Sequence, residues 1–201
     1  MTAAKKSEGQ ELAGYEVLLC VTGGIACYKA ANLASKLTQA GAGVSAAMTE
    51  AACRFVAPLT FQSLTQRQVF TSLWQSTECY DMQHISLTEA ADLMIVAPAT
   101  ADMIAKMACG IADDLVSTLA LAASGACEIL VAPAMNSRMW LAAVTEENVA
   151  KLKKRGIHFV GPTEGRLACG TAGPGRMAEP DEILAAAAKL LLKGPPKKTK
   201  A

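Results

Sequence analysis

The sequence predicts one α/β domain of three layers, in which an open parallel sheet of about six strands has helices on both faces. Its 201 residues suffice for one domain with a substantial core. Apolar residues make up 52% of the chain and aromatic residues only 4%, which favours tightly packed aliphatic helices on a sheet over an aromatic-rich all-β fold. Short continuous apolar runs alternate with stretches of helical spacing, and such strands are typical of parallel sheets buried on both faces.

The first part of the chain alternates strand and helix. An apolar run that ends at Thr22-Gly23-Gly24 predicts the first strand, and Gly41 ends the helix that follows. A second apolar run ends at Thr49, and a short helix and a weaker strand come after it. In order, the expected elements are strand 15–21, helix 25–39, strand 44–48, helix 58–64 and strand 68–73.

The second part continues the alternation after a polar loop at 75–83. Pro98 closes the fourth strand, and Gly156 ends the amphipathic helix before the last strand. Residues 161–179 are rich in Gly and Pro, and their glycine-dense part at 168–177 predicts a loop or flap. In order, the expected elements are helix 85–91, strand 93–97, helices 101–107 and 113–123, strand 128–132, helix 145–155, strand 157–160 and helix 180–192.

The natural strand order for this alternation is 3-2-1-4-5-6, a Rossmann-like or flavodoxin-like arrangement that binds ligands where the order reverses. We expect the domain over residues 15–194, after a disordered leader at 1–14. A basic tail at 195–201 contains the run from Lys197 to Lys200, which is expected to be solvated.

Composition excludes several classes of protein. Seven cysteines are scattered without any Cys-x-x-Cys pair, which disfavours a zinc site and favours a reducing compartment. A net charge of +1 provides no strong field for nucleic acid or an anionic membrane. The polar N-terminus lacks a signal peptide's apolar core, and no apolar run approaches the ~20 residues of a membrane span. We therefore expect a cytoplasmic protein with no metal, nucleic-acid or membrane partner.

Two loops are candidates for binding a phosphate. In the segment from Thr22 to Ala26, glycines allow backbone N–H groups to approach an anion at a helix N-terminus. The dinucleotide fingerprint cannot be fitted, and Thr49 stands where an acidic residue would end the second strand, so a mononucleotide is favoured over NAD. Thr100, after the fourth strand, either caps the next helix or presents its hydroxyl to the same phosphate. A tight turn without a ligand is the alternative for the first loop.

Three side chains are candidates for catalysis. Asn136 follows an apolar strand at the sheet edge where open α/β folds hold ligands. His84 begins a helix whose positive end disfavours imidazolium, so it can accept a proton near pH 7, although a surface histidine is the alternative. Cys169 lies in a glycine-dense segment outside the expected core, and a thiol with an ordinary pKa of about 8.5 can donate a proton. A tolerated loop cysteine is the alternative there, and His158, inside a strand, is expected to be structural.

The chain resembles the flavin-dependent cysteine decarboxylases from about Val17 to Met177. Motifs in the order of that family carry the resemblance: Gly-Gly-Ile-Ala, Met-Thr-Glu-Ala-Ala, His-Ile, Ala-Pro-Ala-Thr-Ala-Asp, Pro-Ala-Met-Asn-x-x-Met-Trp and Ala-Cys-Gly. Within the family, the chain is most similar to the bacterial branch that decarboxylates 4′-phosphopantothenoylcysteine to 4′-phosphopantetheine and CO2 in coenzyme A biosynthesis. Members of that branch are commonly the N-terminal part of a bifunctional protein.

The resemblance implies a cofactor, a substrate and an assembly. FMN is the implied cofactor, and its phosphate is implied to lie near Gly23, Gly24, Thr49, Thr100 and Met103. The other implied cofactor-binding residues are Ile25, Ala101 and Asp102. The implied catalytic residues are His84, Asn136 and Cys169, and the implied substrate contacts are Met135, Asn136 and the flap residues Ala168, Cys169 and Gly170. The family forms trimers or tetramers of trimers, with FMN at subunit contacts. The implied chemistry is a hydride transfer from the thiol-bearing carbon to the flavin and back after CO2 has left, with Cys169 as proton donor.

Three relatives of the same fold compete with this interpretation. An oxidative peptidyl-cysteine decarboxylase stops at the ene-thiol and lacks the flap cysteine, so Cys169 argues against it. A flavin prenyltransferase would not be expected to carry Ala-Cys-Gly. A non-catalytic FMN-binding regulatory subunit is disfavoured because His84, Asn136 and Cys169 occur together.

Overall fold

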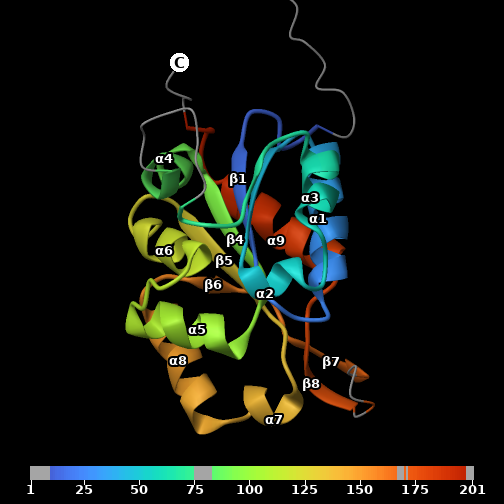
Figure 1. The fold of residues 1–201 in the computed structure, drawn as a ribbon, viewed down its shortest axis with the longest axis vertical. Helices are drawn as coiled ribbons and strands as arrows, with labels where there is room; N and C mark the ends of the chain where they lie inside the picture. Colours follow the sequence, from blue (N-terminus) through green and yellow to red (C-terminus); the bar gives the residue numbers. More distant parts are fainter. Residues whose placement is uncertain (1–9, 75–82, 167–169, 171, 198–201) are drawn as a thin grey trace, which may run out of the picture.

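A computed structural model of the protein describes residues 10–74, 83–166, 170 and 172–197. Its main sheet has six parallel strands in the order β3-β2-β1-β4-β5-β6, so the predicted fold class and strand order are confirmed (Figure 1). The strands are β1 (Glu16–Val21), β2 (Gly43–Met48), β3 (Val69–Phe70), β4 (Leu93–Ala99), β5 (Glu128–Pro133) and β6 (His158–Phe159).

Helices cover both faces of this sheet because the side chains of each strand alternate between two apolar clusters. On β1, Leu19 packs on one face and Leu18 on the other. One cluster lies beneath helices α1 (Cys27–Gln39), α3 (Pro58–Thr65) and α9 (Pro180–Leu191). The other lies beneath α4 (Gln83–Ala90), α5 (Ala101–Cys109), α6 (Leu115–Ala122) and α8 (Ala143–Lys154). None of the helices in the described part of the chain has the length and apolar character needed to cross a bilayer.

Several predictions of local structure were wrong. Strand β4 does not stop before Pro98 but continues to Ala99, because its register with β5 shifts between Val96 and Ala99 and the missing N–H of proline is tolerated at such an irregularity. Two one-turn helices, α2 (Glu50–Cys53) and α7 (Ser137–Trp140), were not foreseen.

The Gly- and Pro-rich segment at 161–179 contains a second, two-stranded sheet instead of a simple loop. Strands β7 (Thr163–Arg166) and β8 (Ala172–Arg176) pair antiparallel. The glycines of β8 allow close approach to the chain before α7, since a Cβ at Gly175 would lie 2.3 Å from the Met135 carbonyl oxygen. The glycines that predicted a loop therefore serve packing.

Both predicted ends of the domain also need correction. Residues 10–14, assigned to the disordered leader, form a turn in which Leu12 is fully buried and its amide donates to the Ala40 carbonyl (2.9 Å). Lys197, assigned to a solvated tail, donates from Nζ to the carbonyls of Ala91 (2.6 Å) and Ala126 (2.7 Å). Residues 1–9 and 198–201 lie outside the described part of the chain.

Candidate functional site

The two predicted phosphate loops meet at the carboxyl edge of the sheet, where β1 and β4 lie side by side. The Thr22 hydroxyl links them: it donates to the Pro98 carbonyl (2.6 Å) and accepts from the Thr100 amide (3.1 Å). Thr22 is almost fully buried. One buried hydroxyl therefore holds both loops at the point where the strand order reverses, which is where open α/β sheets bind ligands.

Threonines cap the helices that begin at this edge. The Thr100 hydroxyl oxygen accepts from the Met103 amide (3.2 Å) at the start of α5, so the capping alternative for Thr100 is confirmed. In the same way, Thr49 accepts from the Ala52 amide (3.1 Å) at the start of α2. These caps orient both hydroxyls at the edge, whereas the Met103 amide is already hydrogen-bonded within its own helix.

The two glycines after β1 have different surroundings. A Cβ at Gly23 would lie 2.5 Å from the Ala51 Cβ and 2.9 Å from its carbonyl carbon, so the loop packs against α2 with no room for a side chain. A Cβ at Gly24 would meet nothing within 4 Å. Gly23 thus lets the backbone pack closely, while Gly24 leaves open space where a ligand can approach the main chain.

A pocket of about 530 Å³ opens beside these loops, a size typical of small-molecule sites. It brings together Gly24, Ile25, Met135 and Asn136 from the predicted site. It is lined by Gly24, Ile25, Ala26, Tyr28, Lys29, Ala134, Met135, Asn136, Arg166, Gly175, Arg176 and Met177.

Asn136 is held in the wall of this pocket by local hydrogen bonds. Its Oδ1 caps α7 by accepting from the Arg138 amide (2.8 Å). The preceding Met135 amide donates to the Gly175 carbonyl of β8 (2.9 Å). The asparagine side chain is therefore fixed between the end of β5 and the β7–β8 hairpin.

Three cations that were not predicted also line this pocket: Lys29, Arg166 and Arg176. Lys29 is only 6% exposed, and its Nζ donates to the Met177 carbonyl (3.1 Å) and to the Glu179 carboxylate (2.9 Å). Arg176 pairs with the same carboxylate. The hydrogen bond from Lys29, together with the two positive charges, lowers the pKa of Glu179. A lysine on the otherwise apolar face of α1 was the one available sequence signal.

Two predicted catalytic residues are not placed in the pocket. His84 lies in the first turn of α4 and does not line the pocket. Figure 1 places α4 at the opposite end of the molecule from the hairpin and α7. Cys169 and its neighbour Ala168 lie outside the described residues, and Gly170 is described but does not line the pocket.

Other cysteines of the described chain are poor candidates for acid–base chemistry. Burial raises the pKa of Cys20, Cys27 and Cys127, which keeps these thiols protonated. Cys27 also donates from Sγ to the Thr22 carbonyl (3.2 Å). They behave as small core residues.

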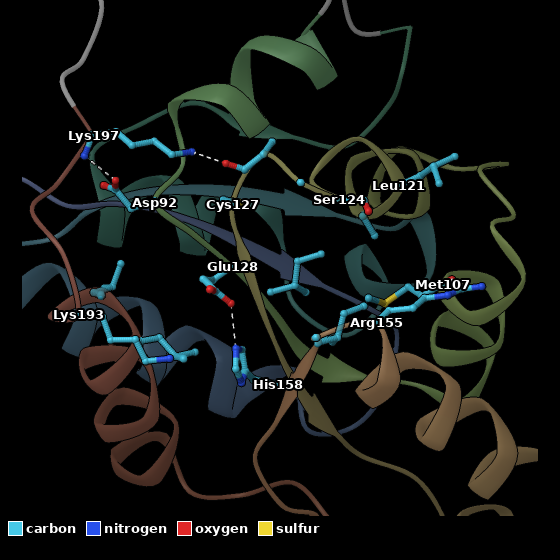
Figure 2. Close-up of a pocket in the computed structure, with 18 of the residues that line it drawn as sticks. Asp92, Met107, Leu121, Ser124, Cys127, Glu128, Arg155, His158, Lys193 and Lys197 are labelled. Carbon is cyan, nitrogen blue, oxygen red and sulfur yellow. Dashed lines mark hydrogen bonds and ion pairs between the residues drawn. The ribbon is translucent and has the colours of Figure 1, made fainter.

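A larger pocket, of about 810 Å³, lies at the opposite, amino-terminal edge of the sheet. Figure 2 shows Glu128 pointing toward His158, the first residues of β5 and β6, at 2.8 Å. It also shows Lys197 beside Asp92, whose carboxylate accepts from the Lys197 amide (2.7 Å). These groups are paired with one another and lie at the edge of the sheet opposite the phosphate loops and Asn136, so the smaller pocket is the candidate site.

Exposed apolar side chains border the candidate site on its α1 and α3 side. Ile25 and Tyr28, both in the pocket lining, are more than 60% exposed, and Phe55 and Leu59 are also exposed. Exposed apolar side chains that form one contiguous patch are typical of a surface that contacts another protein.

Comparisons with known proteins agree with the motif resemblance. The family model described as Flavoprotein matches residues 5–192. The chain is 50% identical over 173 residues to the coenzyme A biosynthesis bifunctional protein CoaBC of Bacillus subtilis (strain 168), covering 86% of this chain and 42% of that protein. For CoaBC of Escherichia coli (strain K12) the identity is 47% with the same coverage. The chain thus spans less than half the length of these curated relatives.

Solved structures of similar fold agree with these sequence relatives. A cysteine-to-serine mutant of PPC decarboxylase complexed with pantothenoylaminoethenethiol is 30% identical, with a TM-score of 0.77 over 90% of this chain and 99% of that one. The FMN binding protein AtHal3 is 32% identical, with a TM-score of 0.78 and the same coverage. The predicted resemblance is therefore confirmed at the level of family and fold.

Proposed function

The chain belongs to the Flavoprotein family, and from this premise we propose that it catalyses the FMN-dependent decarboxylation of 4′-phosphopantothenoylcysteine to 4′-phosphopantetheine and CO2. The main support for this proposal is that Asn136 lines a pocket beside the two predicted phosphate loops, which follow β1 and β4. The identity to CoaBC and the likeness to PPC decarboxylase support the choice of substrate.

The loops at the carboxyl edge fit the phosphate of FMN. The backbone at Gly24 is open to a ligand, and neutral amides and threonine hydroxyls surround the N-termini of α2 and α5. We assign the phosphate to Gly23, Gly24, Thr49 and Thr100. FMN bound there supplies a reversible hydride acceptor for the thiol-bearing carbon, which gives the departing carboxyl group the electron sink that cysteine lacks.

Asn136 is the proposed contact to the substrate carboxylate. A neutral amide can orient the carboxylate by hydrogen bonds without holding its charge strongly. A cation in contact with the carboxylate would stabilise the ground state more than the transition state, in which that charge is leaving. The caps around Asn136 keep this donor in place during the reaction.

Cys169 is the proposed proton donor that completes a non-oxidative reaction. Without a donor at this point the reaction would end at the ene-thiol, which is the outcome expected of an oxidative peptidyl-cysteine decarboxylase. The complex of a cysteine-to-serine PPC decarboxylase with an aminoethenethiol supports a reductive second half that needs a cysteine.

We further propose that the active site is completed between copies of the chain. His84 is the proposed base for the substrate thiol, yet it lies on α4, away from the pocket of its own chain. The exposed Ile25, Tyr28, Phe55 and Leu59 give the pocket an apolar border suited to a second copy. A homotrimer, or a dodecamer built from trimers, would bring His84 of one copy to the flavin of another.

The substitution Asn136→Asp tests the proposal at the reacting group. Aspartate caps a helix as well as asparagine does, so α7 should keep its position, while the added charge repels the substrate carboxylate. We expect kcat/KM to fall by about a hundredfold or more with FMN still bound. The control Asn136→Ser keeps a neutral capping residue and should retain more activity than the aspartate variant. Turnover of the aspartate variant at the wild-type rate would contradict the assignment.

A further inference from the structure

The candidate pocket has an excess of positive charge. Its lining contains Lys29, Arg166 and Arg176 and no carboxylate. Glu179, immediately behind the wall, pairs with both Lys29 and Arg176. The described residues of the site thus carry three positive charges and one negative charge, that of Glu179. The net charge of these four side chains is therefore +2.

The two arginines are carried by the same hairpin. Arg166 ends β7 and is exposed, and its side chain makes no hydrogen bond or ion pair with another residue in the described ranges. Arg176 ends β8, and its Nη1 lies 3.1 Å from the place that a Cβ at Gly165 would take. The Arg176 side chain thus crosses over Gly165 toward the neighbouring strand, and both arginines line the same pocket.

The hairpin also ties these cations to the proposed carboxylate contact. The carbonyl of Gly175 accepts a hydrogen bond from the Met135 amide. Gly175 directly precedes Arg176, and Met135 directly precedes Asn136. The pocket therefore has a neutral amide near one part of its wall and two guanidinium groups on the hairpin. A ligand bound along it meets different chemistry at its two ends.

From this arrangement we infer that Arg166 and Arg176 bind the phosphate monoester of the substrate, and so select the phosphorylated substrate. A phosphate monoester carries a charge of about −1.5 to −2 at pH 7 and three strong acceptor oxygens, which matches two uncompensated cations. Guanidinium groups bind such oxygens in a bidentate manner. The inference rests on the proposed function, since it names the group that distinguishes its substrate.

The test compares ligands that differ only in the phosphate. The dissociation constants of 4′-phosphopantetheine and pantetheine are measured by calorimetry on the flavin-loaded protein, for wild type, Arg166→Gln, Arg176→Gln and the double variant. We expect wild type to prefer the phosphorylated ligand, and each substitution to weaken its binding about tenfold or more while pantetheine binding changes little. Arg138→Gln, an exposed arginine of α7 outside the pocket lining, should leave both constants unchanged.

Three results would overturn the inference. Equal weakening of both ligands would mean that the arginines only support the hairpin. No change for either ligand would exclude the contact. A fall in the preference of the apoprotein for FMN over riboflavin would assign the arginines to the flavin phosphate instead. Because binding needs no turnover, a protein that binds as expected but releases no CO2 would contradict the proposed reaction and leave the phosphate site standing.

Discussion

At the scale of single residues, the site depends on two adjacent glycines with different tasks. Gly23 packs so closely on Ala51 that a side chain cannot be added without moving the loop away from α2. Gly24 faces open space beside the pocket. The missing side chain of Gly23 allows the close packing of the loop on α2, and that of Gly24 leaves room for a ligand.

Alanine substitutions separate these two tasks. Gly23→Ala should lower the free energy of unfolding of the flavin-free protein by about 1–3 kcal/mol, because backbone and Cβ of Ala51 block the new methyl group. Gly24→Ala should change that stability by less than about 1 kcal/mol but lower the amount of bound flavin. Urea unfolding and flavin absorbance measure the two effects. Equal destabilisation by both substitutions would refute the division of roles.

Residues whose role depends on local sequence were predictable, and residues that depend on distant contacts were not. A helix cap could be named as one of two roles for Thr100 because a cap needs only the next three residues. Lys29 was missed because its partner Glu179 is 150 residues away in the sequence. Arg166 was missed because nothing in a Gly- and Pro-rich stretch indicates which side chains turn toward a pocket.

At the scale of elements, α5 and α6 are joined by a charged cluster beside a helix cap. Lys106 of α5 pairs with Asp102 (3.3 Å), Asp113 (3.0 Å) and Asp114 (3.1 Å). Asp114 is also the N-cap of α6, where its side chain accepts from the Ser117 amide in a capping box. Since Thr100 caps the start of α5, this cluster supports the helix that starts at the proposed phosphate site.

The cap is expected to matter more than the ion pairs. Asp114→Ala should cost about 1–2 kcal/mol, or roughly 2–8 °C in Tm, because it removes the cap as well as a charge. Asp102→Ala removes an exposed partner of the same lysine without touching a cap and should cost less than about 0.5 kcal/mol. Thermal unfolding followed by circular dichroism measures both. Equal losses would show that the charge of the cluster, and not the cap, stabilises α6.

Short elements explain where the predicted secondary structure failed. A one-turn helix such as α2 or α7 has too few residues for a helical pattern to be recognised. The hairpin β7–β8 is built from residues that normally interrupt strands, and it forms because its glycines allow contact with the chain before α7. Both cases lie at the candidate site, where tertiary contacts override local preference.

At the scale of the whole molecule, two carboxylates link stability to acid pH. Hydrogen bonds from Lys106 and Lys29 lower the pKa values of Asp113 and Glu179, respectively. A carboxylate with a lowered folded-state pKa stabilises the fold fully above its unfolded pKa, about 4, and loses that contribution as the pH falls further. We expect these pairs to leave Tm unchanged between pH 7 and pH 5 and to lower it below about pH 4. In Lys106→Met, Tm should fall less steeply with decreasing pH below about pH 4. A fall as steep as that of wild type would contradict the proposed contribution of the Lys106–Asp113 pair.

The sheet order was predictable from sequence because alternating strands and helices leave few arrangements of a parallel sheet. The complete active site was not predictable from sequence, because His84 and the pocket lie apart within one chain. The proposed assembly of several copies is the physical reason that one chain does not bring its motifs together.

The most direct test of the proposed reaction is anaerobic conversion of 4′-phosphopantothenoylcysteine by the flavin-loaded protein, with CO2, product and flavin absorbance followed together. We expect CO2 in an amount equal to the substrate consumed, 4′-phosphopantetheine as product, and flavin that is oxidised when the reaction ends, with no external electron acceptor. Accumulation of an ene-thiol together with reduced flavin, or the absence of CO2, would contradict it.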